Sequence, residues 1–462
     1  MNESSLSTKN NNFPSNLIPY FLLIFSVLIL IYTFYKSEIV YNGSISNFYF
    51  KYYLVSIALI VFSVISFFLK KQLKINFFLI SISIIFSLYL IELFFGLYDM
   101  SKYSESNYGL NFQDKRTKYQ VYQDLKNSGK RVVVPISPLS SVSTINDEDE
   151  VYPLSGMSNT TTIYCNENGY WVIYKSDRYG FNNPDEEWDK SILEFVLVGD
   201  SFTHGSCVNK EDTIAGNLRL KNDGSGVLNL GYDGNGPLVE LATLKEYLPY
   251  IKTKNVLWIF YEENDLTDLK REISNKTLKK YLDQDFNQNL IKKQNEIDIK
   301  ISSVFEERLK GIKKIKPGQI FVDKFHLINF LKLKNLRLRL SYIFNLNLVN
   351  TFVEINLPLF SEILYKADNL VKKNNGKLYF VSLPMRGSHD LYNQETEAFN
   401  THKKILNIVN KLDIPIIDIY KEVFAKHPDP LSLFPFRKLS FHYNEEGYKL
   451  VSEAILDKIK ID

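Results

Sequence analysis

Three long apolar runs set the N-terminal part of the chain apart from the rest. They extend over about residues 17–35, 52–69 and 75–97. As a helix, each is long enough to cross roughly 30 Å of hydrocarbon. No small-residue cleavage site follows the first run, so we expect a retained helix rather than a removed signal peptide. The pattern therefore predicts a membrane anchor over residues 1–98 with three transmembrane helices.

Positive charges between the runs indicate an orientation. Lys70, Lys71 and Lys74 cluster between the second and third runs, and the loop between the first and second has no comparable excess. The positive-inside rule places the lysine-rich loop in the cytoplasm. We therefore expect a multi-pass protein embedded in the lipid bilayer, with a cytoplasmic N-terminus and with everything after about Tyr98 outside the membrane.

A polar segment over residues 99–190 follows the anchor. It contains a predicted helix over 114–126 and a Pro-, Ser- and Asp-rich stretch over 135–150. Two β-prone runs, 161–165 and 170–174, flank an Asn-Glu-Asn-Gly sequence, which is typical of a hairpin turn. We interpret this segment as a linker with an accessory helix and hairpin.

Apolar runs alternate with helical stretches from about residue 192 onwards, and this order is typical of a parallel sheet covered by helices. The predicted strands cover residues 193–198, 227–230, 256–260, 378–383 and 415–419. The connection between the third and fourth strands is far longer than a crossover requires, which predicts a helical cap insertion over about 266–349. The expected fold of residues 191–462 is a three-layer α/β/α domain with a mainly parallel five-stranded sheet.

Composition and charge narrow the function classes. The hydrophobic content of 45% is enough for a large core, and the net charge of +3 is too small to indicate a nucleic-acid partner. Cys165 and Cys207 both fall in the part expected outside, where they could form a disulfide, although two buried free thiols are the alternative. Neither cysteine has the spacing of a zinc site. We expect no metal and no cofactor.

Candidate catalytic residues follow the predicted strands. The first strand runs into Gly199-Asp200-Ser201, which places a hydroxyl at the carboxyl edge of the sheet, beside a helix N-terminus. Glycines that allow close backbone approach, Gly234 among them, follow the second strand, and Asn264 follows the third. His442 comes after the fifth strand, just before an amphipathic stretch. The carboxyl ends of parallel strands share one edge, so these residues are candidates for a single site.

In their order and strand-end placement, these residues resemble the SGNH (GDSL-type) hydrolase family, in particular its membrane-anchored bacterial members. The resemblance covers about residue 192 to the C-terminus. It implies that Ser201 is the nucleophile and His442 its general base. It further implies an oxyanion hole made by the backbone N–H groups of Ser201 and Gly234 and by the side-chain amide of Asn264.

One departure from the family pattern concerns the third member of a catalytic triad. The family usually has an aspartate two or three residues before the histidine, but Ser440 and Leu439 occupy these positions. Either a Ser-His dyad operates, or an acid arrives from elsewhere. Asp429 and Asp418 are candidates without motif support.

The resemblance and the predicted location together indicate an ester hydrolase or O-acyltransferase outside the bacterial cytoplasmic membrane. Both reactions pass through an acyl-serine, and an acylated envelope glycan is the expected substrate. A membrane acyltransferase or a glycan-export protein could be a partner. The alternative is a catalytically weak glycan-binding or scaffold protein that retains the fold, and the missing aspartate favours it.

Overall fold

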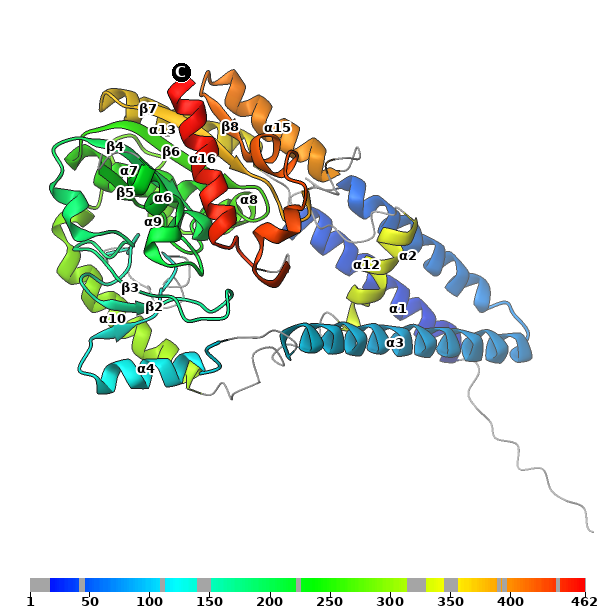
Figure 1. Cartoon of the computed structure of the whole chain (residues 1–462). Helices are drawn as coiled ribbons and strands as arrows, with labels where there is room; N and C mark the ends of the chain where they lie inside the picture. The colour runs from blue at the N-terminus through cyan, green and yellow to red at the C-terminus, as the bar shows by residue number, and fades with distance from the viewer. Residues whose placement is uncertain are drawn as a thin grey trace, which may run out of the picture. The chain divides into compact units, whose positions relative to one another are not determined.

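The computed structural model divides the chain into two compact units. The helical unit comprises residues 1–109 and 321–354, and the sheet unit comprises residues 110–320 and 355–462. Colour follows the chain through both units in Figure 1. The structure describes residues 17–40, 46–108, 113–138, 151–221, 226–313, 330–344, 356–388, 392, 397–437 and 441–461.

Three helices of the helical unit are long and apolar enough to cross a membrane. They are α1 (Leu17–Phe34), which continues as the π-helical η1 (Tyr35–Val40), α2 (Ser46–Ser66) and α3 (Lys71–Tyr108). The apolar spans within them measure 23, 18 and 27 residues. Large side chains such as Phe21, Phe86 and Phe94 are more than 60% exposed, as expected of helices that face lipid. The three predicted spans are confirmed as helices of this length and composition.

A helix from much later in the chain packs within the helical unit. The carboxylate of Glu92, on α3, accepts hydrogen bonds from the backbone N–H groups of Asn335 at 3.0 Å and Leu336 at 2.8 Å. These donors lie in the first turn of α12 (Lys334–Phe344). A carboxylate at a helix N-terminus is stabilised by the unpaired N–H groups and by the helix dipole. Part of the segment predicted as a cap over 266–349 therefore lies against a candidate membrane helix.

The sheet unit is built on a five-stranded parallel sheet in the order β5-β4-β6-β7-β8. The strands are β4 (Leu193–Gly199), β5 (Gly226–Asn229), β6 (Thr253–Tyr261), β7 (Lys377–Leu383) and β8 (Ile416–Asp418). The strand order reverses at β4, because β5 pairs with one of its edges and β6 with the other. The parallel α/β architecture predicted from the sequence is confirmed.

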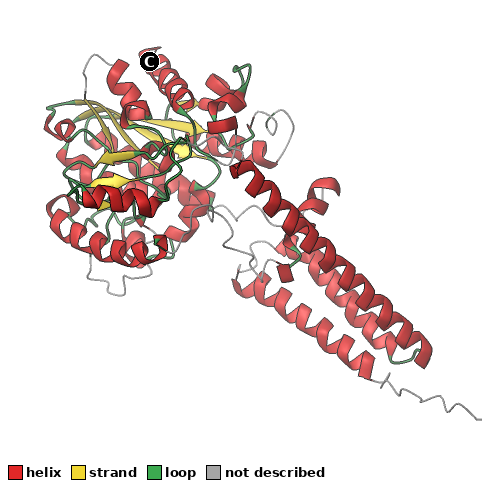
Figure 2. Ribbon diagram, turned by 60° about the horizontal axis from the view of Figure 1, so that its bottom comes forward, coloured by secondary structure: helices red, strands yellow, loops and turns green. Residues whose placement is uncertain are grey.

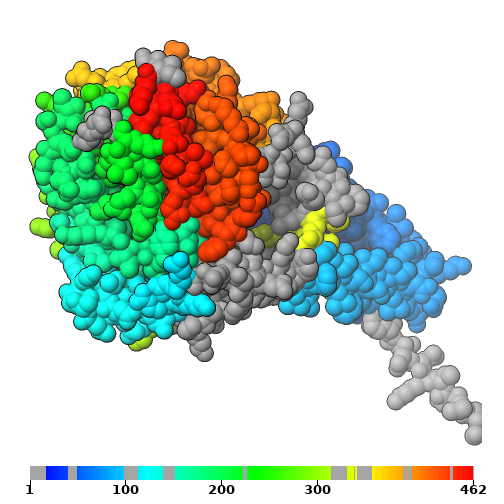
Figure 3. All heavy atoms as spheres, in the orientation of Figure 1, coloured from blue at the N-terminus to red at the C-terminus, as the bar shows by residue number. Residues whose placement is uncertain are grey.

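Helices cover both faces of this sheet (Figure 2). Helices α7 (Pro237–Tyr247), α13 (Leu357–Lys373) and α15 (Glu397–Lys411) pack on one face, and α6 (Ile214–Lys221) and α16 (Glu445–Ile461) on the other. Side chains alternate between the two cores along β4: Val196 and Val198 face the first, Phe195 and Leu197 the second. Burial on both faces explains why the strands are continuous apolar runs. In Figure 3, α16 forms the red surface of the second face.

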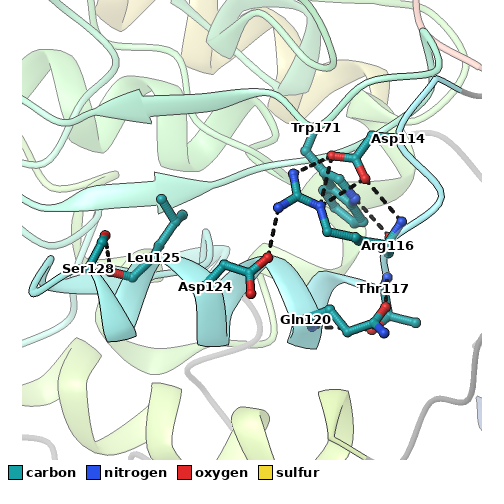
Figure 4. Close-up of polar contacts among 8 residues, drawn as sticks. All are labelled: Asp114, Arg116, Thr117, Gln120, Asp124, Leu125, Ser128 and Trp171. Carbon is teal, nitrogen blue, oxygen red and sulfur yellow. Dashed lines mark hydrogen bonds and ion pairs between the residues drawn. The ribbon is translucent and has the colours of Figure 1, made fainter.

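The accessory segment forms a small three-stranded sheet. Strand β2 (Thr161–Ile163) pairs antiparallel with β3 (Ile173–Lys175) and parallel with β1 (Val132–Val133). Helix α4 (Lys118–Asn127) begins with a capping box between Thr117 and Gln120. Arg116, just before it, pairs with Asp114 and Asp124, and its carbonyl accepts a hydrogen bond from the Trp171 indole (Figure 4). The hairpin and the helix are thereby joined.

The other helices with bounds inside the described residues are short, apart from α10. They include η3 (Asp185–Asp189), α5 (Ser201–His204), η4 (Lys210–Asp212), η5 (Leu248–Tyr250), α8 (Asp265–Glu272), α9 (Lys276–Lys280), η6 (Leu290–Lys292), α10 (Gln294–Ile312), η7 (Tyr420–Phe424), η8 (Pro430–Leu433) and η9 (Pro435–Arg437). Tyr122 of α4 packs against Phe305 of α10, with 5.8 Å between ring centroids.

A buried polar cluster joins the carboxyl ends of β6, β7 and β8. Glu262, whose side chain is 3% exposed, accepts a hydrogen bond from Ser382 Oγ at 2.6 Å and lies 2.6 Å from His402 Nδ1. His402 Nε2 lies 3.4 Å from Asp418 Oδ2. Burial lowers the pKa of His402, but its hydrogen bonds to Asp418 and Glu262 raise the pKa on balance to about 9. The ring is therefore a cation at neutral pH.

We predict that, because of His402, the stability of the sheet unit decreases at alkaline pH. Its pKa of about 9 in the folded protein compares with about 6.5 in an unfolded chain. The contribution of His402 to the free energy of unfolding is therefore complete below about pH 6.5 and is lost as the pH rises through about 9. At about 1.4 kcal/mol for each pKa unit, the whole contribution is of the order of 3 kcal/mol.

Denaturant unfolding at several pH values tests this contribution. His402→Gln should flatten the alkaline decline of the free energy of unfolding, whereas His427→Gln, outside the cluster, should not. Equal slopes in the wild type and the His402 variant would contradict the assignment.

Candidate active site

Ser201 lies at the sharp turn where β4 ends and α5 begins. Gly199 is required there, because a Cβ on it would approach Thr203 Oγ1 to 2.0 Å and the Ile259 carbonyl oxygen to 2.6 Å. The side chain of Asp200 caps α5 by accepting a hydrogen bond from the N–H of Phe202 at 2.9 Å. These constraints present the hydroxyl of Ser201, a residue that is 8% exposed, at the carboxyl edge of the sheet.

His442 lies against this serine. Its Nε2 is 3.0 Å from Ser201 Oγ, although the two residues are 241 positions apart in the sequence. The imidazole packs on the ring of Phe202, with 4.8 Å between centroids, and its side chain is 27% exposed. A hydroxyl and an imidazole at this distance form the nucleophile and base arrangement of acyl-transfer enzymes.

The acid beside His442 is Glu167, which the sequence prediction missed. Its Oε2 lies 3.0 Å from His442 Nδ1 and also accepts a hydrogen bond from the backbone N–H of His442 at 2.7 Å. A carboxylate at Nδ1 favours the tautomer with the proton on that atom, which leaves Nε2 free to accept the serine proton. Glu167 belongs to the turn between β2 and β3, in the accessory segment.

The acids proposed from the sequence have other partners. Asp418 lies beside His402, and Asp429 pairs with Arg437 at 2.9 Å. The positions that the family pattern favours, Ser440 and Leu439, fall outside the described residues. The Asn-Glu-Asn-Gly sequence is typical of a turn, and a carboxylate in a turn is normally solvated. Only the folded arrangement reveals that Glu167 faces the histidine.

Charges around His442 make it a stronger base. Burial lowers the pKa of His442, but the charge and hydrogen bond of Glu167, together with the negative charges of Asp200 and Asp233, raise it above its usual value on balance. Burial raises the pKa of Glu167, whereas the charge of His442 and its hydrogen bonds lower that pKa overall. The carboxylate is therefore ionised at neutral pH, beside an imidazole that accepts protons readily.

Asn264, the expected oxyanion donor, lies close to the serine. Its Nδ2 is 3.0 Å from Asp268 Oδ2 and 3.4 Å from Asp200 Oδ2, and the latter oxygen is 3.3 Å from Ser201 Oγ. Burial raises the pKa of Asp200 to about 6. Both amide hydrogens thus face carboxylates, and the longer contact is the one that a substrate oxygen could replace.

The loop after β5 carries Gly234 and lies beside α5. The N–H of Tyr232 donates to the Gly199 carbonyl at 3.1 Å, and a Cβ on Gly231 would approach Thr203 Cβ to 2.4 Å. The N–H of Asp233 donates to His204 Nδ1 at 3.2 Å, and burial lowers the pKa of His204 to about 3, so this ring is neutral. Gly234 has φ +74°, which favours glycine. The structure therefore brings the Gly234 loop, Ser201, Asn264 and His442 to one region.

A disulfide joins Cys165 to Cys207. It links the residue two positions before Glu167 to the segment that follows α5. Ligand atoms of Glu167, Cys207 and His442 lie within 4.8 Å of one another, a set that could attract a metal ion if the sulfur were a thiolate. A sulfur held in a disulfide is not a thiolate ligand, and the other two groups hydrogen-bond to each other. This arrangement favours proton transfer.

Comparison with known proteins finds similar solved structures. No family model and no curated protein matches the chain. A member of the lipolytic protein G-D-S-L family from Veillonella parvula is 13% identical, with a TM-score of 0.31, and the match covers 57% of this chain and 97% of that chain. A carbohydrate esterase family 2 enzyme with a carbohydrate binding domain, from Corynascus thermopiles (Myceliophthora fergusii), is 9% identical, with a TM-score of 0.30, covering 58% and 65% of the two chains.

Replacement of Asn264 by alanine tests the oxyanion hole. Loss of one donor that acts mainly in the transition state should lower kcat about 10²- to 10³-fold and leave KM nearly unchanged. Steady-state hydrolysis of p-nitrophenyl acetate measures both constants. Asn410→Ala, on the exposed surface of α15, is the matched control and should match the wild type. A normal kcat for Asn264→Ala would remove this residue from the site.

Proposed function

We propose that this chain is a membrane-anchored, extracytoplasmic ester hydrolase or O-acyltransferase of the SGNH type. The observation that carries the proposal is the 3.0 Å separation between Ser201 Oγ and His442 Nε2. Such a pair at the carboxyl edge of a parallel sheet, beside a helix N-terminus, is suited to attack on an ester carbonyl.

The proposed reaction has two steps. His442 Nε2 accepts the hydroxyl proton as Ser201 Oγ attacks the carbonyl carbon, and the developing oxyanion is stabilised by N–H groups of Ser201, Gly234 and Asn264. Collapse of this intermediate transfers the proton from His442 to the departing alcohol and leaves an acyl-serine. His442 then activates water in hydrolysis, or a sugar hydroxyl in acyl transfer, and Ser201 is regenerated.

The proposed location and substrate class rest on the candidate membrane helices. The helical unit supplies three helices of membrane-spanning length, and Lys70, Lys71 and Lys74 lie between the second and third. The positive-inside rule then places the sheet unit outside the cytoplasmic membrane. Acylated glycans of the envelope are esters within reach of such a site, and a membrane acyltransferase or a glycan-export protein would be a natural partner.

The alternative, a catalytically weak glycan-binding protein with the same fold, depended on the missing aspartate. Glu167 at 3.0 Å from His442 Nδ1 offers a carboxylate at the atom where that aspartate would act. This contact favours the enzyme over the binding protein.

Chemical labelling of the full-length protein tests the nucleophile. A serine-directed phosphonate should modify wild-type protein at Ser201. Ser201→Ala should not be labelled, and its ester turnover should be at least about 10³-fold lower. Ser303→Ala, on the exposed surface of α10, is a control that keeps the nucleophile. Unchanged turnover in Ser201→Ala would refute the site, and absence of labelling in the wild type would refute the enzyme.

Reporter fusions test the orientation. A reporter that is active only outside the cytoplasm should be active after Glu150, and a cytoplasmic reporter should be active after Lys74. The reverse pattern would place the sheet unit in the cytoplasm and would exclude an envelope substrate.

A further inference from the structure

The acid that faces His442 comes from a different part of the sheet unit than the serine and the histidine. Ser201 follows β4, and His442 precedes α16, whereas Glu167 lies in the turn of the β2–β3 hairpin. One carboxylate oxygen of Glu167 receives two hydrogen bonds, from the ring and from the backbone of His442. This geometry fixes both the position and the tautomer of the ring.

The disulfide ties the Glu167 turn to the serine segment. Cys165 precedes the turn, and Cys207 follows α5, which begins with Ser201. The amide of Asn168 adds a hydrogen bond to the Cys207 carbonyl at 2.8 Å. A covalent link and a hydrogen bond from opposite sides of Glu167 therefore converge on the same residue of the serine segment.

A second contact ties the turn to the histidine segment. The hydroxyl of Tyr170 donates to Glu445 Oε1 at 2.5 Å, and Glu445 is the first residue of α16, just beyond His442. The side chain of Glu167 is 21% exposed, so water competes for its carboxylate. An exposed charge pair contributes little stabilising free energy unless its partners are held in place, because ordering the side chains costs entropy. The turn needs a rigid attachment for the Glu167 contact to persist.

We propose that Glu167 is the positioning residue of the catalytic centre and that the Cys165–Cys207 disulfide holds it against His442, so that reduction of the disulfide lowers turnover while Ser201 and His442 remain in place. The inference rests on the proposed esterase or acyltransferase function. A phosphine can reduce this disulfide. It gives two electrons to the disulfide, which takes up two protons to form two thiols, and the phosphine becomes its oxide with oxygen from water.

Replacement of the carboxylate tests the positioning role. Glu167→Gln should lower kcat about 10²- to 10⁴-fold, and Glu167→Asp should restore part of the loss. The acid limb of the kcat/KM profile should move to lower pH, because the charge that raises the pKa of His442 is gone. Asp200 and Asp233 still raise the pKa of His442 in this variant, whereas Arg386 acts on the Glu167 carboxylate that is removed, so the limb should shift rather than vanish. The exposed Glu446→Gln, whose partner is Lys449, should match the wild type.

Reduction of each protein tests the role of the disulfide. The phosphine should lower kcat in the wild type, as should Cys165→Ser combined with Cys207→Ser, but should change Glu167→Gln far less, because two changes that act through one contact are not additive. Thermal unfolding of each variant separates this effect from loss of the fold.

The outcomes distinguish this inference from the proposed function. Failure of the phosphonate to label wild-type Ser201 overturns the function itself. Normal labelling with a wild-type kcat and acid limb in Glu167→Gln overturns the positioning role alone. Equal losses on reduction in the wild type and in Glu167→Gln overturn the role of the disulfide.

Discussion

The hydrogen bond between Ser201 Oγ and His442 Nε2 connects residues that are 241 positions apart in the sequence, and the sheet makes this contact attainable. The strand order reverses at β4, and Ser201 follows this strand while Asn264 follows the neighbouring strand β6. Helix α16 packs through Tyr448 and Val451 into the same core as Ile214 of α6. Packing on that face of the sheet therefore fixes the position of the segment that carries His442.

Electrostatics at the site follow from the balance between burial and partner charges. Asp200 is fully buried, and burial raises its pKa to about 6, whereas the charge and hydrogen bonds of His442 outweigh the effect of burial on Glu167 and lower its pKa. The serine hydroxyl thus has two acceptors, the imidazole at 3.0 Å and the Asp200 carboxylate at 3.3 Å. The shorter contact is the one with the more basic partner, which favours transfer of the proton to His442.

Sequence patterns were sufficient for the elements and for part of the site. The strands are apolar because both sheet faces are covered, and Ser201, Asn264 and His442 stand just beyond strands or before a helix, so their convergence could be predicted. Glu167 could not be, because it is 275 positions from His442 and lies in a turn that is ordinary in composition. The same holds for α12: the sequence predicts a helical cap over about 266–349, but contacts such as the one with Glu92 assign α12 to the helical unit.

The chain enters the helical unit a second time, and this passage divides the proposed catalytic residues between two segments of the sheet unit. Ser201 and Glu167 belong to residues 110–320, His442 belongs to residues 355–462, and the passage between them runs through the helical unit. The helical unit is therefore an internal component of the connection between Ser201 and His442. A fragment that begins after α3 would still contain α12 but would lack the Glu92 carboxylate that caps it. Truncation that removes the three candidate membrane helices would consequently leave an uncapped, partly apolar helix inside the remaining chain.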